Sequence, residues 1–166
     1  MVTRADPQMF LIAVFGEVLC AKASPFEASI ILVGFSSGSL ALYRLSQLNP
    51  TTIFTPPSSS RKPVSSVEWS PISQNIFYSL HGYSRLLIWD LSMGRTPQAV
   101  NDLSQQIPSR VVNTRIWVQK TENPSRNGIA YLALGLNSGK VEVHALETVR
   151  AKKEGNLLSA IKALDE

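Results

Sequence analysis

One block of this sequence occurs twice at a spacing of about 46 residues, and a weaker third copy follows it. The run Ser24–Ser46 aligns without a gap on Ser70–Ser92. The identical pairs are Ser24/Ser70, Pro25/Pro71, Ile30/Ile76, Leu40/Leu86, Leu45/Leu91 and Ser46/Ser92. The third copy, Ile129–Glu147, places Gly139, Val141, Val143 and Leu146 where the second has Ser84, Leu86, Ile88 and Leu91. A repeat of this length restricts the chain to a small set of architectures.

Each copy contains short apolar runs separated by turn residues, which is the pattern of antiparallel strands. The expected strands are Glu17–Ala23, Ser29–Gly34, Ser39–Leu45 and Thr51–Thr55, then Val64–Trp69, Asn75–Leu80, Arg85–Leu91 and an irregular Pro97–Ile107, then Val111–Val118, Ile129–Gly135 and Lys140–Leu146. Gly38 and Gly139 fall in equivalent turns and can take the positive φ that tight hairpins need. Four strands per repeat predict an all-β chain of about three propeller blades.

The repeats divide the chain into segments. We expect residues 1–16 to be an outer strand of a preceding blade or a leader, 17–56 a blade, 57–63 a Pro/Ser-rich loop, 64–109 a blade, 110–147 an incomplete blade and 148–166 a C-terminal helix. In the tail, Leu157, Leu158, Ile161 and Leu164 share one helical face, and the firm helix is predicted over Asn156–Asp165. That face is expected to pack on the neighbouring blade, with the helix replacing a fourth strand.

Three blades do not close a propeller, which needs four to eight. The sequence therefore predicts the C-terminal part of a larger propeller, with upstream blades of the same protein as neighbours. The segment Gln8–Phe15 would be the outer strand of the blade before it.

The first 23 residues also resemble a secretory signal, with Arg4, an apolar run Met9–Phe15 and a small-residue end at Ala21–Ala23. Asp6 before the run and Glu17 after it argue against this interpretation, and Val18–Ala23 occupies the place of a blade strand. No stretch approaches the roughly 20 apolar residues that cross a bilayer, so membrane insertion is not expected.

Composition indicates a globular chain, with 44% hydrophobic and 17% charged residues. The net charge of +4 is scattered, and runs such as Arg61-Lys62 are too short for a nucleic-acid arm, so no nucleic-acid partner is expected. The single cysteine, Cys20, aligns with Ser66 and excludes an internal disulfide, which fits a reducing compartment.

The side chains that carry catalysis are sparse. The two histidines have structural explanations, because His81 is predicted in a hairpin turn and His144 takes the position of Trp89. No phosphate-binding glycine loop, His/Cys cluster or paired-carboxylate motif occurs. The sequence predicts no catalytic, cofactor-binding or metal-binding residues, and a protein that is not an enzyme.

Trp69-Ser70-Pro71 and Trp89-Asp90 make the chain resemble the WD-repeat family over nearly its whole length. The repeat signature is carried by Ser24, Pro25, Gly38, Trp69, Ser70, Pro71, Trp89, Asp90 and Gly139. No copy has the Gly-His dipeptide of that family, so its buried Asp-His-Ser-Trp network is not expected here. Trp89 should instead pack within its blade, and Asp90 should cap a turn.

Within this family the two best copies, "SGKVEVHALE" and the tail resemble the final blades of dynein intermediate chains, most of all that of cytoplasmic dynein 2, the retrograde motor of intraflagellar transport. The resemblance implies a non-catalytic scaffold of the cytoplasm and ciliary cytoskeleton that binds a dynein heavy chain and other dynein subunits. Two alternatives remain open: a WD-repeat scaffold of another intracellular complex, and a secreted propeller enzyme if the N-terminus were a signal. Partner contacts are expected on the loops Met93–Ser109, Gln119–Asn127 and His81–Ser84.

Overall fold

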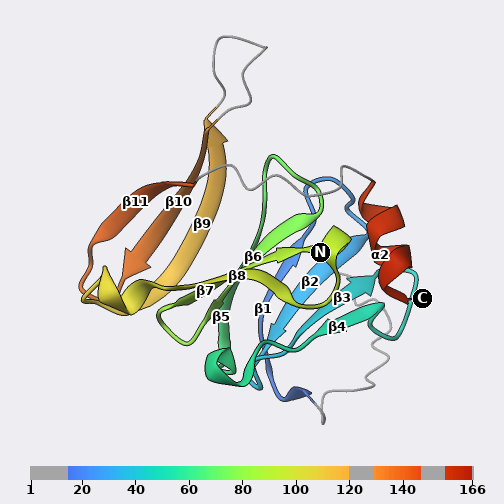
Figure 1. Cartoon of the computed structure of the whole chain (residues 1–166), viewed down its shortest axis with the longest axis horizontal. Helices are drawn as coiled ribbons and strands as arrows, with labels where there is room; N and C mark the ends of the chain where they lie inside the picture. Colours follow the sequence, from blue (N-terminus) through green and yellow to red (C-terminus); the bar gives the residue numbers. More distant parts are fainter. Residues whose placement is uncertain (1–14, 120–128, 147–155, 166) are drawn as a thin grey trace, which may run out of the picture.

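The computed structural model describes residues 15–119, 129–146 and 156–165. These residues form three antiparallel sheets in chain order and one helix (Figure 1). The first sheet is β1 (Val18–Ala23), β2 (Ile30–Phe35), β3 (Leu40–Arg44) and β4 (Thr52–Phe54). The second is β5 (Val64–Trp69), β6 (Ile76–His81), β7 (Arg85–Asp90) and β8 (Pro97–Asp102). The third is β9 (Val111–Gln119), β10 (Ile129–Leu136) and β11 (Val141–Leu146).

The strands follow the predicted repeat within one or two residues, except that the strand predicted over Pro97–Ile107 ends at Asp102. The pairing register repeats as well, because Ile30 lies opposite Arg44 in the first sheet and Ile76 lies opposite Asp90 in the second. The predicted all-β class, about three blades with a short helix, is confirmed.

The strands β6 and β10 differ in how apolar and more exposed residues follow one another, and burial explains this difference. All six residues of β6 are buried, because both faces of the second sheet are covered. A strand covered on both faces is apolar at most positions rather than alternating. In β10 buried residues alternate with more exposed ones, which is the pattern of a strand with one covered face.

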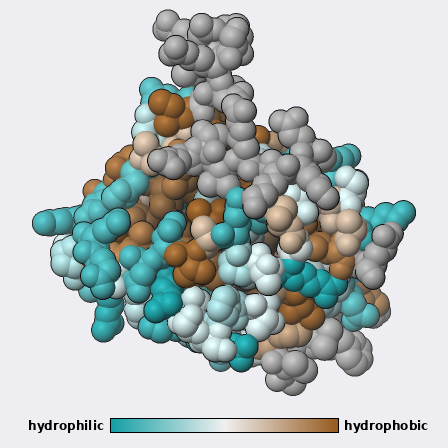
Figure 2. Space-filling model, viewed as in Figure 1, coloured by the Kyte–Doolittle hydropathy of each residue, from teal (hydrophilic) through white to brown (hydrophobic). Residues whose placement is uncertain are grey.

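Two hydrophobic cores join consecutive sheets face to face. Between the first and second sheets, the rings of Phe77 and Trp89 are stacked with centroids 5.6 Å apart, and Phe54 meets Trp89 edge-on at 5.5 Å. Between the second and third sheets, β6 and β7 pack against β9 and β10 through aliphatic side chains. On the face shown in Figure 2, hydrophobic residues reach the surface in several places between hydrophilic ones.

The first strands of the three sheets lie next to one another. The Trp69 indole N–H donates to the Lys22 carbonyl at 3.1 Å, which joins β5 to β1. The hydroxyls of Ser66 and Thr114 lie 2.6 Å apart and join β5 to β9. β1, β5 and β9 are therefore the inner strands, in agreement with the blade prediction.

One predicted strand is shorter than expected. The segment Pro97–Ile107 was expected to be an irregular outer strand; the strand covers Pro97–Asp102 and pairs with β7, with a shift in register between Ile88 and Trp89. The chain then turns through the 3₁₀ helix Leu103–Gln105, where the Asp102 side chain accepts a hydrogen bond from the Ser104 N–H.

The helix α2 (Leu157–Asp165) does not lie where the sequence placed it. It was expected to replace the fourth strand of the third blade, yet it packs against the first and second sheets, beside β4 and on the opposite side of the molecule from β11 (Figure 1). Leu157 and Ile161 are buried in the core that contains Phe54 and Leu91. Its apolar stripe packs within the chain, as predicted, because it closes the open end of that core.

Several predictions fall outside the described residues: the outer strand Gln8–Phe15 apart from Phe15, the apolar run of the signal interpretation, the loop 120–127 and the tail 148–155. Phe15 packs its ring against Phe35, with centroids 5.5 Å apart. Within the described ranges, no helix is long and apolar enough to cross a membrane.

Candidate functional site: a groove at one end of the blades

The Ser-Pro pairs of the repeat signature occupy turns between the first and second strands. The Ser24 hydroxyl accepts hydrogen bonds from the N–H groups of Phe26 and Glu27, at 3.2 and 3.4 Å. Ser70 accepts two equivalent bonds from residues 72 and 73. Both serines are buried, so their hydroxyls stabilise the turn and face no open surface. Pro25 and Pro71 follow them in the same turns.

Other members of the signature also have structural surroundings. Gly38 and Gly139 have φ of +88° and +81° in equivalent hairpins. Asp90 accepts hydrogen bonds from the Ser92 N–H at 2.9 Å and from the Ser92 hydroxyl at 2.6 Å, which begins a 3₁₀ turn. Trp69 bridges two inner strands through its indole N–H, as described above.

The prediction that His81 lies in a hairpin turn is wrong, and part of the buried network that was not expected is present. His81 is the last residue of β6 and is completely buried, rather than lying in the hairpin turn. The Trp89 N–H donates to the Ser79 hydroxyl at 2.8 Å, and that oxygen lies 2.8 Å from His81 Nε2. His81 Nδ1 lies 3.3 Å from the Lys62 carbonyl, which can only accept, so Nδ1 carries the proton and Ser79 donates to Nε2.

This Trp-Ser-His chain keeps three members of the family's four-residue network, which was not expected here, and the Lys62 carbonyl takes the place of the aspartate at His81 Nδ1. Its signal in the sequence is a serine and a histidine two residues apart on one strand, which places both on the face that Trp89 covers. Burial lowers the pKa of His81 to about 4, so the ring is neutral near pH 7. A neutral, buried and hydrogen-bonded histidine has a structural role, and the His81 ring is not open to a substrate.

The inner strands carry three charged side chains side by side, which no motif of the sequence indicates. Lys22, Glu68 and Arg115 occupy equivalent registers of β1, β5 and β9. The Lys22 Nζ lies 3.0 Å from the buried Glu68 carboxylate, and an Arg115 guanidinium nitrogen lies 3.7 Å from the same oxygen. One carboxylate therefore joins all three sheets near their inner edge. Cys20 lies on the same side of β1, and burial raises the pKa of its thiol to about 11, which makes it a poor nucleophile.

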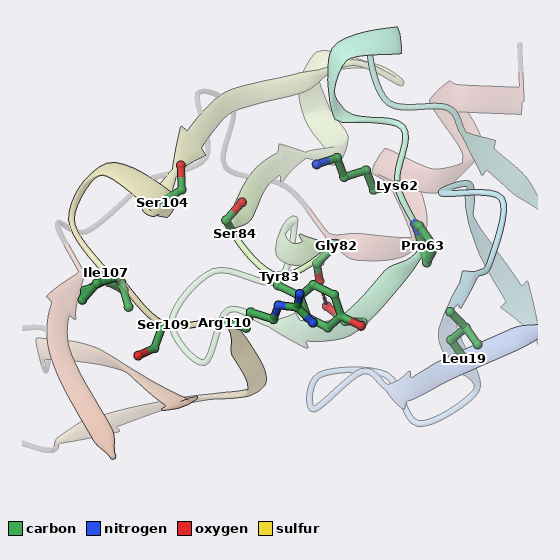
Figure 3. A pocket seen from close by; sticks show the side chains of 12 residues that line it. Leu19, Lys62, Pro63, Gly82, Tyr83, Ser84, Ser104, Ile107, Ser109 and Arg110 are labelled. Atoms are coloured by element: carbon green, nitrogen blue, oxygen red, sulfur yellow. Dashed lines mark hydrogen bonds between the residues drawn. The ribbon is translucent and has the colours of Figure 1, made fainter. Parts of the chain in front are cut away.

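The candidate functional surface is a groove at the end of the sheets where the β6–β7 turn lies (Figure 3). Its volume is about 560 Å³, within the range of pockets that hold ligands. It is lined by Leu19, Lys62, Pro63, Ser65, Gly82, Tyr83, Ser84, Ser104, Ile107, Pro108, Ser109 and Arg110. Two of the three loops expected to contact partners meet here, the His81–Ser84 turn and the end of Met93–Ser109. The third, Gln119–Asn127, lies outside the described residues after Gln119.

Tyr83 and Arg110 form the centre of this groove. The Arg110 guanidinium carbon lies 5.1 Å from the centroid of the Tyr83 ring, a cation–π geometry, and Figure 3 shows the two side chains together. The backbone fixes both, since the Val111 N–H donates to the Tyr83 carbonyl at 3.0 Å and the Arg110 N–H donates to the Asn137 side chain at 3.1 Å. Tyr83 remains 52% exposed, so its ring is available to a partner.

The walls of the groove are held by the chain on either side. The Gly82 N–H donates to the Pro63 carbonyl at 2.8 Å, and the Ser65 hydroxyl donates to the Gly82 carbonyl at 2.7 Å. Lys62 thus belongs to a segment fixed to the β6–β7 turn. The sequence predicted the loops but not Lys62, Tyr83 or Arg110, because residues from three distant segments converge only in the folded chain.

The groove is cationic. Its lining contains Lys62 and Arg110 and no carboxylate. Nearby Asp102 has its pKa lowered, chiefly by hydrogen bonds from Ser104 and further by the charges of Arg85 and Lys62, and its carboxylate lies 3.6 Å from Arg85. In the described part of the chain, neither Lys62 nor Arg110 has a carboxylate within ion-pair distance. No group of metal-ligating side chains occurs there either.

The fold has a counterpart among solved structures. A WD40 propeller chain in the crystal structure of the mitotic checkpoint complex superposes on 79% of this chain and 36% of its own length, with a TM-score of 0.56 and 13% identity. That likeness concerns the fold. With its three repeating sheets, the chain has the fold of part of a WD40 β-propeller.

Sequence comparison finds relatives among dynein intermediate chains. No family model matches the chain. Its homologues are the cytoplasmic dynein 2 intermediate chain 1 of Mus musculus, 34% identical over 75% of this chain, and that of Homo sapiens, 29% identical over 85%. The chain spans only 12–13% of the length of these relatives.

Proposed function

We propose that this chain is part of a propeller that acts as a non-catalytic scaffold in a dynein motor of the cytoplasmic dynein 2 kind. The observation that carries the proposal is the 34% identity to a dynein 2 intermediate chain over three quarters of the chain, together with the shared propeller fold. Its partners would be a dynein heavy chain and other dynein subunits, and its place the ciliary cytoskeleton during retrograde transport.

The uncovered face of the third sheet supports a larger propeller around this chain. Ile76, Leu86 and Ile88 of the second sheet are buried against the third. Val141 and Val143, which take the registers of Leu86 and Ile88, are 68% and 56% exposed. This face of the third sheet therefore has the apolar residues of a blade interface. In a larger propeller, as the sequence predicts, a further blade would cover it.

The same face carries aromatic side chains. Trp117 of β9 lies directly opposite Tyr131 of β10, and their rings are stacked with centroids 5.5 Å apart. Trp117 is 39% exposed. Large aromatic side chains left accessible on a sheet face are typical of surfaces that become buried on association.

The test is affinity purification from ciliated cells of the protein tagged at Glu166, followed by mass spectrometry. Recovery of a dynein heavy chain with other dynein subunits supports the proposal. Recovery of a different assembly without dynein overturns it and assigns the protein to the wider class of WD-repeat scaffolds. The matched control is a Val141→Lys/Val143→Lys variant, in which a charged third-sheet face should prevent blade packing and reduce recovery of every partner.

A further inference from the structure

The groove around Tyr83 combines an aromatic platform with two cations. The Tyr83 ring is half exposed, and Arg110 lies over it. Lys62 lies on the other side of the turn, on a segment bonded to Gly82. An arginine held against an aromatic ring is already positioned, so less side-chain freedom is lost when it binds an anion.

The remaining lining adds apolar contacts and neutral hydroxyls. Leu19, Pro63 and Pro108 are exposed at the rim, and Leu19 is 46% exposed. Ser84 and Ser109 supply hydroxyl groups that donate or accept hydrogen bonds, and the Ser104 hydroxyl, which donates to Asp102 at 2.6 Å, can accept one. The lining thus provides apolar surface and hydroxyl groups that can orient a bound ligand. It also provides two positive charges and contains no carboxylate.

We propose that this groove binds an acidic segment of a protein partner. Side-chain carboxylates of the segment bind Lys62 and Arg110, and a neighbouring apolar side chain packs on the Tyr83 ring between Pro63 and Leu19. The proposal rests on the scaffold function proposed above, since it names the chemistry by which the scaffold would hold a partner.

Charge complementarity supports an acidic peptide over a nucleic acid. The groove offers two separate cations, Arg110 over the Tyr83 ring and Lys62 elsewhere in the lining, which suits separate carboxylates. A nucleic-acid site instead follows the phosphate backbone with a longer row of basic residues. The apolar rim also suits the side chains of a peptide better than a ribose-phosphate chain.

The test measures fluorescence anisotropy of two labelled peptides with the purified full chain. One peptide alternates leucine with aspartate, and the other has asparagine in place of every aspartate. We expect the aspartate peptide to bind more tightly, and the Lys62→Gln and Arg110→Gln variants each to weaken it about tenfold, the effect of one charge-assisted hydrogen bond. Lys162→Gln, an exposed cation on α2, is the matched control and should leave binding unchanged.

Tyr83 is tested by two variants with the same readout. Tyr83→Phe keeps the ring and should bind like the native chain, whereas Tyr83→Ala should weaken binding. Thermal unfolding of every variant shows whether it is folded. Equal affinity of the aspartate and asparagine peptides, or equal loss in the Lys162→Gln control, overturns the proposal, and tighter binding of a single-stranded oligonucleotide assigns the groove to nucleic acid instead.

The two proposals can fail separately. If Lys62→Gln/Arg110→Gln loses the peptide while dynein subunits still co-purify, the groove binds acidic peptides but does not hold the motor. If no dynein co-purifies but the native chain binds the aspartate peptide, the scaffold proposal fails and the groove proposal stands.

Discussion

The indole N–H of Trp89 donates a hydrogen bond to the hydroxyl of Ser79, 2.8 Å away on the neighbouring strand. This bond begins a polar chain that passes through His81 to the backbone of Lys62, inside a core that is otherwise apolar. The equivalent positions of the other sheets hold Val33 and Phe35, or Leu134 and Leu136. The second sheet alone among the three carries this network, and it is the sheet that both neighbours cover.

Trp89 should be the most costly single truncation in the second sheet. Its side chain is 1% exposed and contacts the rings of Phe54 and Phe77, so Trp89→Ala should lower the free energy of unfolding by about 3–5 kcal/mol. Trp89→Phe keeps most of the packing but removes the N–H and should cost less. Urea denaturation followed by circular dichroism measures both; similar losses in the two variants would show that the hydrogen bond, and not the packing, dominates.

Stability should fall as the pH is lowered through the titration of His81. Its pKa is lowered from 6.5 to about 4 in the folded chain, so between these values the unfolded chain binds the proton more readily. The neutral His81 ring therefore contributes fully to stability above pH 6.5, and this contribution is lost as the pH falls toward 4. The loss amounts to up to about 3 kcal/mol in the free energy of unfolding. Denaturation at a series of pH values measures the slope.

The variant that isolates this effect is His81→Leu, which copies the leucine of the third sheet. It should be less stable near pH 7, because Ser79 and the Lys62 carbonyl lose a partner, but its stability should depend less on pH between 4 and 6.5. An unchanged slope in His81→Leu would assign the pH dependence to other groups.

The Glu68 carboxylate should stabilise the inner edge of the three sheets. It is buried and joins Lys22 and Arg115, so Glu68→Gln should cost about 1–3 kcal/mol of unfolding free energy. Arg115→Gln should cost less than about 1 kcal/mol, since that side chain is 67% exposed and its ion pair is screened by solvent. Denaturation of both variants at low and high salt provides the comparison, and an Arg115→Gln cost as large as that of Glu68→Gln would contradict it.

Two glycines at the same register should respond differently to alanine. A Cβ at Gly34 would lie 2.5 Å from Val64 Cγ1 and 2.7 Å from Cys20 Sγ, so Gly34→Ala should destabilise by about 1–3 kcal/mol. At Gly135 the nearest atom, Asn113 Cβ, would lie 3.6 Å away, an ordinary contact. Gly135→Ala should therefore change stability by less than about 0.5 kcal/mol. Thermal unfolding of the two variants measures both changes in stability. Equal losses would show that strand propensity outweighs the close approach of β5 to Gly34.

The sequence by itself determined the strands, the turns between them and the number of sheets. Alternating or continuous apolar runs, Ser-Pro turns at Ser24 and Ser70, and positive-φ glycines such as Gly38 are local signals, because each depends on a few residues in succession. The repeat also aligned the residues that take the same register within the first and second sheets, such as Ile30 and Ile76.

Only the tertiary structure decided which faces are covered and which distant residues meet. His81 was predicted in a turn, but it is buried in β6, whose two faces are both covered. The helix α2 was predicted in place of a fourth strand of the third sheet, but it packs in the core around Phe54. Lys62, Tyr83 and Arg110 converge from segments with no shared pattern. The physical reason is that burial and charge complementarity depend on the packing of whole sheets, whereas strand periodicity and turn chemistry depend on neighbours along the chain.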